Sequence, residues 1–229
     1  MLTKARVKSF ANMIDHTNLK PYITHQVWHT LCQQAMDYGF KTVAINNAGI
    51  AVCSDYLKDS PVLVDAAVSF PLGQCTLETK VFETCDAILK GAGEVDYVIN
   101  ISELKNGNWS YIEEEMMQIV AVCGENDVTS KVIFENCYLN DDEKMKLCEI
   151  AVKVKPTFIK TSTGFGTGGA TLADVRLMKA GVGDTIKIKA AGGVRSAEQF
   201  LAMVEAGANR IGTSSGMKII DEMMAQLEA

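Results

Sequence analysis

Eight short apolar or β-branched runs, each followed by a segment with helical spacing, divide this chain along its whole length. The runs have the length and residue types of strands, and the segments between them repeat apolar residues at helical intervals. Strands that alternate with helices pair in parallel, and eight such units close readily into a barrel. The pattern therefore predicts an α/β fold, a single (β/α)8 TIM barrel. The predicted strands are residues 13–15, 42–46, 62–69, 94–99, 131–135, 157–160, 185–189 and 210–212.

Amphipathic segments separate these strands. The apolar side predicted for residues 77–90 includes Leu89. Polar residues that favour the first position of a helix precede or begin several segments, and the predicted N-caps are Thr24, Asn140, Thr171 and Ser196. The predicted helices are residues 24–38, 77–90, 111–122, 141–152, 172–178 and 197–205.

The main alternative fold is an open, doubly wound sheet, which carries its Gly-rich turn directly after the first strand. The first junction here, residues 15–21, contains no glycine. The Gly-rich loops follow the sixth, seventh and eighth strands instead. That placement favours a barrel with a phosphate site at the carboxyl ends of its strands.

Length and composition limit the class of protein. A chain of 229 residues without a linker fits one catalytic domain, residues 1–229. The net charge of −6 argues against a nucleic-acid partner, because phosphate backbones attract basic surfaces. No apolar run approaches a membrane span, and the first ten residues lack the apolar region of a signal peptide. Seven cysteines without a C-x-x-C pair fit a reducing compartment, so we expect a cytoplasmic protein without a membrane partner.

Three late loops carry the anion-binding signal, at residues 161–171, 190–196 and 212–216. Glycines let backbone N–H groups approach an anion closely, and each following helix adds a partial positive charge at its start. One such loop alone is usually only a turn. Three in succession, one of them containing Arg195, predict a phosphate site.

Lys160 and Lys189 end neighbouring predicted strands, each directly before a Gly-rich loop. Lysines in such apolar runs are paired, extend to the surface or have a function. Two ammonium groups held close in a poorly solvated site repel each other, and burial acts in the same direction, so the pKa of one falls. A lysine must lose its proton to attack a carbonyl, so this arrangement suits amine catalysis. The alternative is two surface lysines at strand ends.

Asp96 lies in a mostly apolar strand, where a buried carboxylate needs a cationic partner. Pairing with Lys189 would place it in a proton relay, and a purely structural ion pair is the equal alternative. Asp15, at the end of the first predicted strand, is predicted to cap or anchor a loop. His25 and His29 have the spacing of a metal pair, but no Glu or Cys nearby completes a site, so we expect no metal.

Several of these motifs match a known family. The run F-I-K-T-S-T-G-F-G-T-G-G-A-T at 158–171 is highly specific, and matching segments extend along nearly the whole chain in the same order. The sequence resembles the class I, Schiff-base-forming 2-deoxyribose-5-phosphate aldolases. Further segments that carry the resemblance are residues 15–21, 69–73, 94–100, 187–195 and 210–216.

The resemblance implies reversible cleavage of 2-deoxy-D-ribose 5-phosphate to D-glyceraldehyde 3-phosphate and acetaldehyde. Lys160 would form the Schiff base, Lys189 would lower the pKa of Lys160, and Asp96 would move protons with Lys189 and a water molecule. No metal or organic cofactor is implied, because the protonated imine is itself the electron sink. A homodimer is implied in the same way. The residues that would hold the substrate phosphate are Gly164, Gly192, Gly193, Ser214 and Ser215.

The sequence departs from the family pattern at three places. Ala44 replaces a frequent cysteine, which predicts resistance to inactivation by aldehydes. Lys187 replaces a frequent glycine and, by alternation, shares a face with Lys189. The chain ends at Ala229 without the C-terminal tyrosine of some members, so we expect a different substrate reach.

Two alternatives remain at the level of the sequence. Another phosphate-binding barrel, an isomerase or a lyase of a different sugar phosphate, would share the loops but would not need the lysine pair. A non-catalytic sugar-phosphate-binding barrel would be expected to lack Lys160, Lys189 or Asp96, and all three are present.

Overall fold

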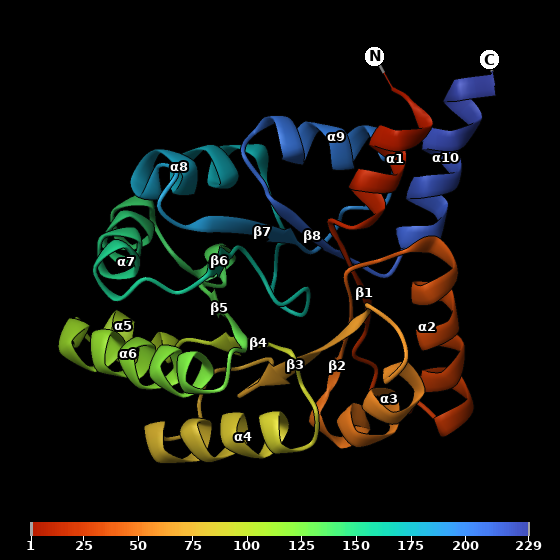
Figure 1. Cartoon of the computed structure of the whole chain (residues 1–229). Coiled ribbons are helices and arrows are strands. Elements are labelled where there is room, and N and C mark those ends of the chain that lie inside the picture. The colour runs from red at the N-terminus through yellow and green to blue at the C-terminus, as the bar shows by residue number, and fades with distance from the viewer. Residues whose placement is uncertain (1, 229) are drawn as a thin grey trace.

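Eight parallel strands form a closed barrel in the computed structural model, which describes residues 2–228. The strands follow one another around the barrel in chain order, and β1 closes it by pairing with β8 (Figure 1). The predicted (β/α)8 fold is confirmed. The strands are β1 (Ile14–Asn18), β2 (Thr42–Asn46), β3 (Leu63–Val68), β4 (Glu94–Val98), β5 (Thr129–Ile133), β6 (Phe158–Lys160), β7 (Lys187–Ala191) and β8 (Arg210–Thr213).

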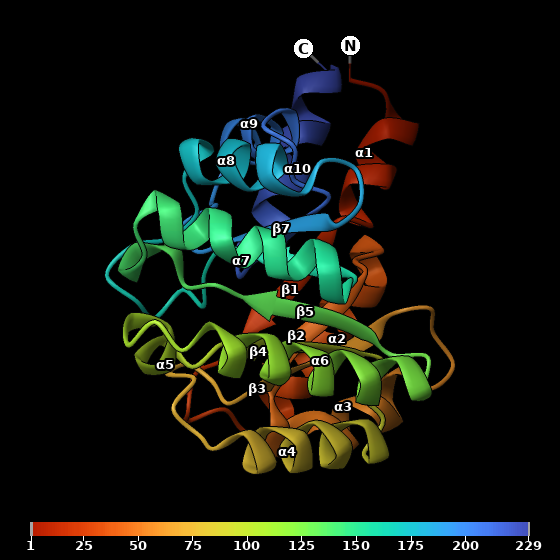
Figure 2. The same cartoon turned by 90° about the vertical axis from the view of Figure 1, so that its left-hand side faces the viewer.

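Helices surround the strands, as Figures 1 and 2 show. All six predicted helices are present, and α1, α3, α5 and α10 were not predicted. Two short 3₁₀ turns, η1 (Asn47–Gly49) and η2 (Asn136–Tyr138), follow β2 and β5. The α-helices are α1 (Lys4–Ala11), α2 (His25–Tyr38), α3 (Ile50–Leu57), α4 (Leu77–Leu89), α5 (Ile101–Lys105), α6 (Trp109–Glu125), α7 (Asp141–Val154), α8 (Leu172–Val182), α9 (Ala197–Glu205) and α10 (Gly216–Glu228).

Each of the four predicted N-caps directly precedes a helix, and three of them make a capping hydrogen bond. Asn140 and Glu143 form a reciprocal capping box at the start of α7. The side chains of Thr171 and Ser196 accept backbone N–H groups at the starts of α8 and α9. Thr24 occupies the N-cap position of α2 but makes no side-chain capping bond.

The strands bury two different faces. Apolar side chains such as Val43, Val95 and Ile188 belong to the hydrophobic core, which also contains the inner faces of the helices. The alternate residues point into the barrel, where charged side chains of several strands meet as ion pairs. Barrel interiors of this fold are commonly filled by branched apolar residues. This barrel therefore has its apolar core outside the strand ring and a charged centre inside it.

Leu89 corrects one detail of the predicted helix faces. Its side chain is 86% exposed, although the sequence predicts it on the apolar side of residues 77–90. The buried face of α4 carries Lys80 instead, whose Nζ lies 2.5 Å from Glu115 Oε1 and donates to the carbonyl oxygen of Val98. Leu89 lies about 100° around the helix from Ile88, which turns it away from the buried side of α4.

The two ends of the chain lie side by side. Helix α1 lies beside α10 in both views, and the ring of Phe10 packs against that of Phe200 at 5.4 Å (Figures 1 and 2). The prediction drawn from the absent C-terminal tyrosine concerns Ala229, which lies outside the described residues.

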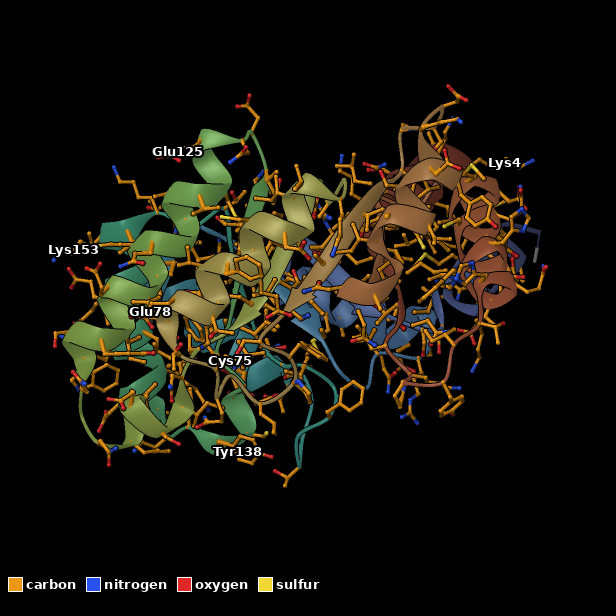
Figure 3. The ribbon with its side chains drawn as sticks, turned by 90° about the horizontal axis from the view of Figure 1, so that it is seen from below. Lys4, Cys75, Glu78, Glu125, Tyr138 and Lys153 are labelled. Atoms are coloured by element: carbon orange, nitrogen blue, oxygen red, sulfur yellow. The ribbon has the colours of Figure 1, made fainter. Side chains whose placement is uncertain are left out.

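Figure 3 places Glu125 and Lys153 at the outer edge of the helical layer. None of the described helices is both long and apolar enough to cross a membrane.

Candidate active site

A cavity of about 320 Å³ opens at the carboxyl ends of the strands. Its floor contains side chains from the barrel interior, and its rim is formed by the loops after β1, β6, β7 and β8. This is the face on which barrels of this class carry their active sites. The lining residues are Thr17, Asn18, Leu19, Lys20, Ala44, Asp65, Ala67, Phe70, Asp96, Lys160, Thr163, Gly164, Phe165, Ala191, Gly192, Gly193, Val194, Arg195, Gly212, Thr213 and Ser214.

Lys160 is the last residue of β6 and reaches this cavity from a buried position. Its Nζ lies 2.5 Å from Asp96 Oδ2 and 5.8 Å from the ring centre of Phe70. Burial lowers the pKa of the Lys160 ammonium, and Lys189 adds to that shift against the opposing charge of Asp96. The amine is therefore easier to deprotonate than that of an ordinary lysine.

Lys189 lies directly opposite Lys160 in the pairing of β7 with β6. Its Nζ contacts three carboxylates, at 2.5 Å from Asp15, 2.8 Å from Asp65 and 2.6 Å from Asp96. Burial alone would lower the pKa of Lys189, but these three carboxylates outweigh it and hold the pKa above its ordinary value. Lys189 therefore stays protonated at pH values at which Lys160 can already lose its proton.

Asp96 connects the two lysines. Its Oδ2 faces both Lys160 and Lys189, while its Oδ1 lies 2.9 Å from Lys131 Nζ. Burial would raise the pKa of this carboxyl, but the three lysines hold the pKa well below its ordinary value. Asp96 is thus an ionised carboxylate that contacts the amines of three lysines.

The prediction that Asp15 caps or anchors a loop is wrong. The residue lies inside β1 and is fully buried, because β1 begins and ends later than predicted. Its carboxylate contacts Lys189 and Arg210 Nη1, the latter at 2.7 Å, and accepts the hydroxyl of Thr42 at 2.8 Å. Asp15 is therefore part of the charged centre.

Four residues that were not predicted from the sequence complete this centre: Asp65, Glu94, Lys131 and Arg210. Lys131 Nζ lies 2.7 Å from Asp65 and 2.8 Å from Glu94. Burial and the neighbouring Asp96 raise the pKa of Asp65 to about 6, although its two lysine partners act in the opposite direction. The signal was available, because Asp65 and Lys131 are single charges within apolar runs, as Asp96 is.

Three of the buried carboxylates also lie close enough together to resemble a metal-ligand set. Oxygens of Asp15, Asp65 and Glu94 lie within 4.8 Å of one another. Each of them already faces a buried cation, either Lys131, Lys189 or Arg210. The negative charge that would attract a metal ion is therefore balanced by the protein itself.

The Gly-rich loops approach one another on one side of the cavity. Gly164, Gly192 and Gly193 adopt positive φ angles near 90°, which favour glycine. A Cβ atom on Gly169 would lie 2.2 Å from the carbonyl oxygen of Gly192. The N–H of Ala170 donates to the same oxygen at 3.0 Å. These contacts hold the first two loops together as a shallow cradle of backbone groups.

Four of the five predicted phosphate-binding residues line the cavity: Gly164, Gly192, Gly193 and Ser214. Ser215 lies just beyond this lining, where its N–H donates to Thr213 Oγ1 at 2.9 Å. Arg195 and Lys20 add two exposed cations to the lining, and Lys20 was not singled out in the sequence. The cradle therefore lies in a positive environment that suits an anion.

Lys187 lies away from this site. It begins β7 in an exposed position opposite Phe158, and its Nζ lies 5.6 Å from the ring centre of that residue. Lys189 is two residues further toward the cavity. The lysine that stands next to Lys160 is therefore Lys189, although alternation gives Lys187 the same side of the strand.

Fold and site together define a class: the (β/α)8-barrel enzymes, with a buried lysine amine and an anion cradle at the carboxyl ends of the strands. A family model described as DeoC/LacD family aldolase matches residues 10–221. The chain belongs to the DeoC/LacD aldolase family.

Individual relatives agree with this family. A deoxyribose-phosphate aldolase of Lactobacillus acidophilus is 53% identical over 225 residues, which cover 98% of this chain and 95% of that protein. One of Thermococcus kodakarensis is 49% identical and covers 93% of this chain and 96% of its own length. The tetrameric deoxyribose phosphate aldolase structure of Aeropyrum pernix superposes with a TM-score of 0.89 at 28% identity, covering 96% of this chain and 93% of that one.

Proposed function

We propose that the chain catalyses the reversible aldol cleavage of 2-deoxy-D-ribose 5-phosphate to D-glyceraldehyde 3-phosphate and acetaldehyde, through a Schiff base on Lys160. The observation that carries the proposal is the unequal environment of the two lysines. Lys160 has a lowered pKa and one carboxylate partner, whereas Lys189 has three and a raised pKa. A neutral amine beside a retained cation suits attack on a carbonyl.

The reaction would begin when neutral Lys160 attacks the aldehyde carbon of the open-chain substrate. Loss of water leaves a protonated imine. Removal of the proton from the C3 hydroxyl then breaks the C2–C3 bond, and its electron pair moves into the imine to form an enamine. D-Glyceraldehyde 3-phosphate leaves at this stage. Protonation of the enamine carbon and addition of water release acetaldehyde and restore the amine. All electrons stay within substrate and lysine, so no cofactor takes part.

Asp96 and Lys189 would handle the protons. The Asp96 carboxylate lies within 2.6 Å of both lysine amines, so it can accept a proton near the imine and return it later. Lys189 would keep its charge and support the ionised form of Asp96. A bound water molecule would complete the path to the substrate.

The cradle would bind the phosphate of the substrate. Backbone N–H groups at Gly164, Gly192 and Gly193, with Ser214 and Ser215, would supply the hydrogen bonds. Arg195 lines the same cavity and would add positive charge. Anchoring the phosphate in this way would hold the far end of the sugar while its aldehyde lies at Lys160.

We also infer that residues 1–229 act as one catalytic domain in the cytoplasm and assemble as a homodimer. Support for the compartment comes from the seven cysteines, all of which are free thiols. Self-association has a precedent in the relative from Aeropyrum pernix, whose structure is described as tetrameric. Light scattering of the purified protein would distinguish a dimer from a tetramer or a monomer.

The reaction itself can be tested with the purified chain. Incubation with 2-deoxy-D-ribose 5-phosphate should release acetaldehyde, which an alcohol dehydrogenase and NADH would report. Lys160→Met should abolish the release, whereas Lys187→Met, at the other end of β7, should preserve it. Failure of the wild-type protein to release acetaldehyde would rule out the proposed activity.

A further inference from the structure

Glu135 is a buried carboxylate to which the proposed reaction gives no role. It follows β5, and its side chain is almost completely enclosed, with 1% exposure. Its oxygens accept the backbone N–H of Thr163, at 3.1 and 3.3 Å, and also the hydroxyl of the same residue. A buried carboxylate is stable only when such donors replace water. Glu135 therefore makes three of its hydrogen bonds with one residue of the first Gly-rich loop, Thr163, and a longer one with the thiol of Cys137.

The backbone at Glu135 has an unusual conformation. Its φ of 56° and ψ of 61° lie in the left-handed region, which residues other than glycine and asparagine rarely adopt. The next residue, Asn136, donates its N–H to the carbonyl oxygen of Thr161 at 2.9 Å. The turn after β5 thus holds the chain on both sides of Ser162. Local strain of this kind persists where the surrounding structure requires one geometry.

Thr163, which is hydrogen-bonded to Glu135, in turn fixes the next residues of the loop. Its hydroxyl accepts the N–H of Phe165 at 3.0 Å, which fixes the peptide groups on either side of Gly164. Gly166 rests on the same turn: a Cβ there would lie 2.7 Å from Cys137 Sγ and 3.3 Å from the Glu135 carboxyl carbon. Residues 163–166 of the loop therefore pack on Glu135 and on the turn that follows it.

Glu135 stands behind this loop, away from the substrate side. Thr163, Gly164 and Phe165 line the main cavity, whereas Glu135 lines a separate small hollow together with Tyr138 and Leu72. Tyr138, labelled in Figure 3, belongs to the turn η2 that Glu135 precedes. The loop thus lies between Glu135 and the cradle, so Glu135 can orient the loop without occupying the anion site.

We propose that Glu135 is a positioning residue that orients the N–H of Gly164 toward the substrate phosphate, and so makes the enzyme selective for phosphorylated sugars. The inference rests on the proposed function, because it assumes that the cradle binds phosphate. It assigns Glu135 no contact with substrate and no proton transfer. Its effect should appear in the preference for 2-deoxy-D-ribose 5-phosphate over 2-deoxy-D-ribose.

The test compares kcat/KM for these two sugars in wild type and variants. Glu135→Ala should lower the ratio of phosphorylated to unphosphorylated activity about 10-fold or more, mainly through KM, as loss of charge-assisted hydrogen bonds predicts. Glu135→Gln should restore most of the ratio, since its amide oxygen can still accept the Thr163 N–H. Borohydride trapping of acetaldehyde on Lys160 should continue in both variants.

Two further variants make the outcome decisive. Glu143→Ala removes a similar carboxylate-to-backbone bond, 2.8 Å from the N–H of Asn140 at the start of α7, and should leave the ratio unchanged. Thr163→Val removes one group bonded to Glu135 and should lower the ratio even if Glu135→Ala fails to fold. An unchanged ratio in Glu135→Ala or Thr163→Val would overturn the inference. A wild-type protein inactive on both sugars would instead refute the proposed function.

Discussion

Lys160 and Lys189 face each other across neighbouring strands, and the amines of both lie within 2.6 Å of the same oxygen of Asp96. Only Lys189 has further carboxylate partners, Asp15 and Asp65. One carboxylate thus serves two lysines of opposite character, because burial and like charge lower the pKa of Lys160 while added carboxylates raise that of Lys189.

Replacing Lys189 should change the pH dependence of catalysis. Lys160 must be neutral to attack, so activity is present above the pKa of Lys160 and is lost as the pH falls through it. Lys189→Met removes the like charge that lowers this pKa, so the acidic limb of the kcat/KM profile should move to higher pH. Loss of its part in proton transfer should also reduce kcat/KM about 100-fold or more. An acidic limb that stays in place would contradict this role.

Lys187→Met is the matched control for that experiment. Lys187 lies on the same strand but is exposed at its start, beside Phe158. Its removal should change kcat/KM by less than about threefold, as expected for a surface substitution, and should leave the acidic limb where it was. A shift as large as that of Lys189→Met would mean that both lysines tune Lys160.

Lys131→Met should destabilise the protein strongly. Lys131 contacts Asp65, Glu94 and Asp96, and all four side chains are buried. Removing the cation leaves its carboxylate partners short of compensating charge, which should lower the free energy of unfolding by about 3–5 kcal/mol. Urea denaturation would measure the change. Lys146→Met, which breaks the exposed pair with Glu149, should cost no more than about 1 kcal/mol in the same assay.

Gly169→Ala should disturb the cradle without touching the lysines. The added Cβ would lie 2.2 Å from the carbonyl oxygen of Gly192, so the two loops must separate. We expect KM for 2-deoxy-D-ribose 5-phosphate to rise about 10-fold or more, as the hydrogen bonds to phosphate lengthen. Gly124→Ala, in open space near the end of α6, should leave KM unchanged. Steady-state kinetics that give equal KM values for both variants would argue against the cradle.

Ala44→Cys should make the enzyme sensitive to aldehyde. Ala44 lines the cavity, and among the described residues no cysteine does so. A thiol at this position would place a reactive nucleophile beside the Schiff base and its aldehyde product. Residual activity after soaking in concentrated acetaldehyde should therefore fall further in Ala44→Cys than in wild type. Ala44→Ser supplies the control without a thiol, and equal losses in all three proteins would remove this explanation.

Much of the fold was predictable because short apolar runs alternate along the chain with segments that have helical spacing. The eight apolar runs located every strand to within a few residues, and the placement of Lys160 and Lys189 predicted that they would meet at the same level of the barrel. Helices α1, α3 and α5 were missed because their eight, eight and five residues span only about two turns or fewer, too few to show helical periodicity. Leu89 was misplaced because it follows Ile88 by one residue, which turns it about 100° around the helix toward solvent.

The charged centre was harder to predict than the strands. Asp65, Lys131 and Arg210 belong to three strands that are far apart in the sequence, and only closure of the barrel brings their side chains together. Asp65 and Lys131 are single charges in apolar runs, but the sequence alone does not identify their partners. Asp15 was placed at the end of its predicted strand and interpreted as a cap or loop anchor. The register between strands, which sequence spacing does not specify, decided these four positions.

The most direct measurement is reductive trapping of acetaldehyde with borohydride, followed by peptide mass mapping. We expect an N-ethyl group on Lys160 and none on Lys189, because the pKa is lowered at Lys160 and raised at Lys189. Trapping should weaken as the pH is lowered and should vanish in Lys160→Met. An adduct on Lys189, or an unmodified wild-type protein that nevertheless cleaves the sugar phosphate, would contradict the assignment of Lys160 as the amine that forms the Schiff base.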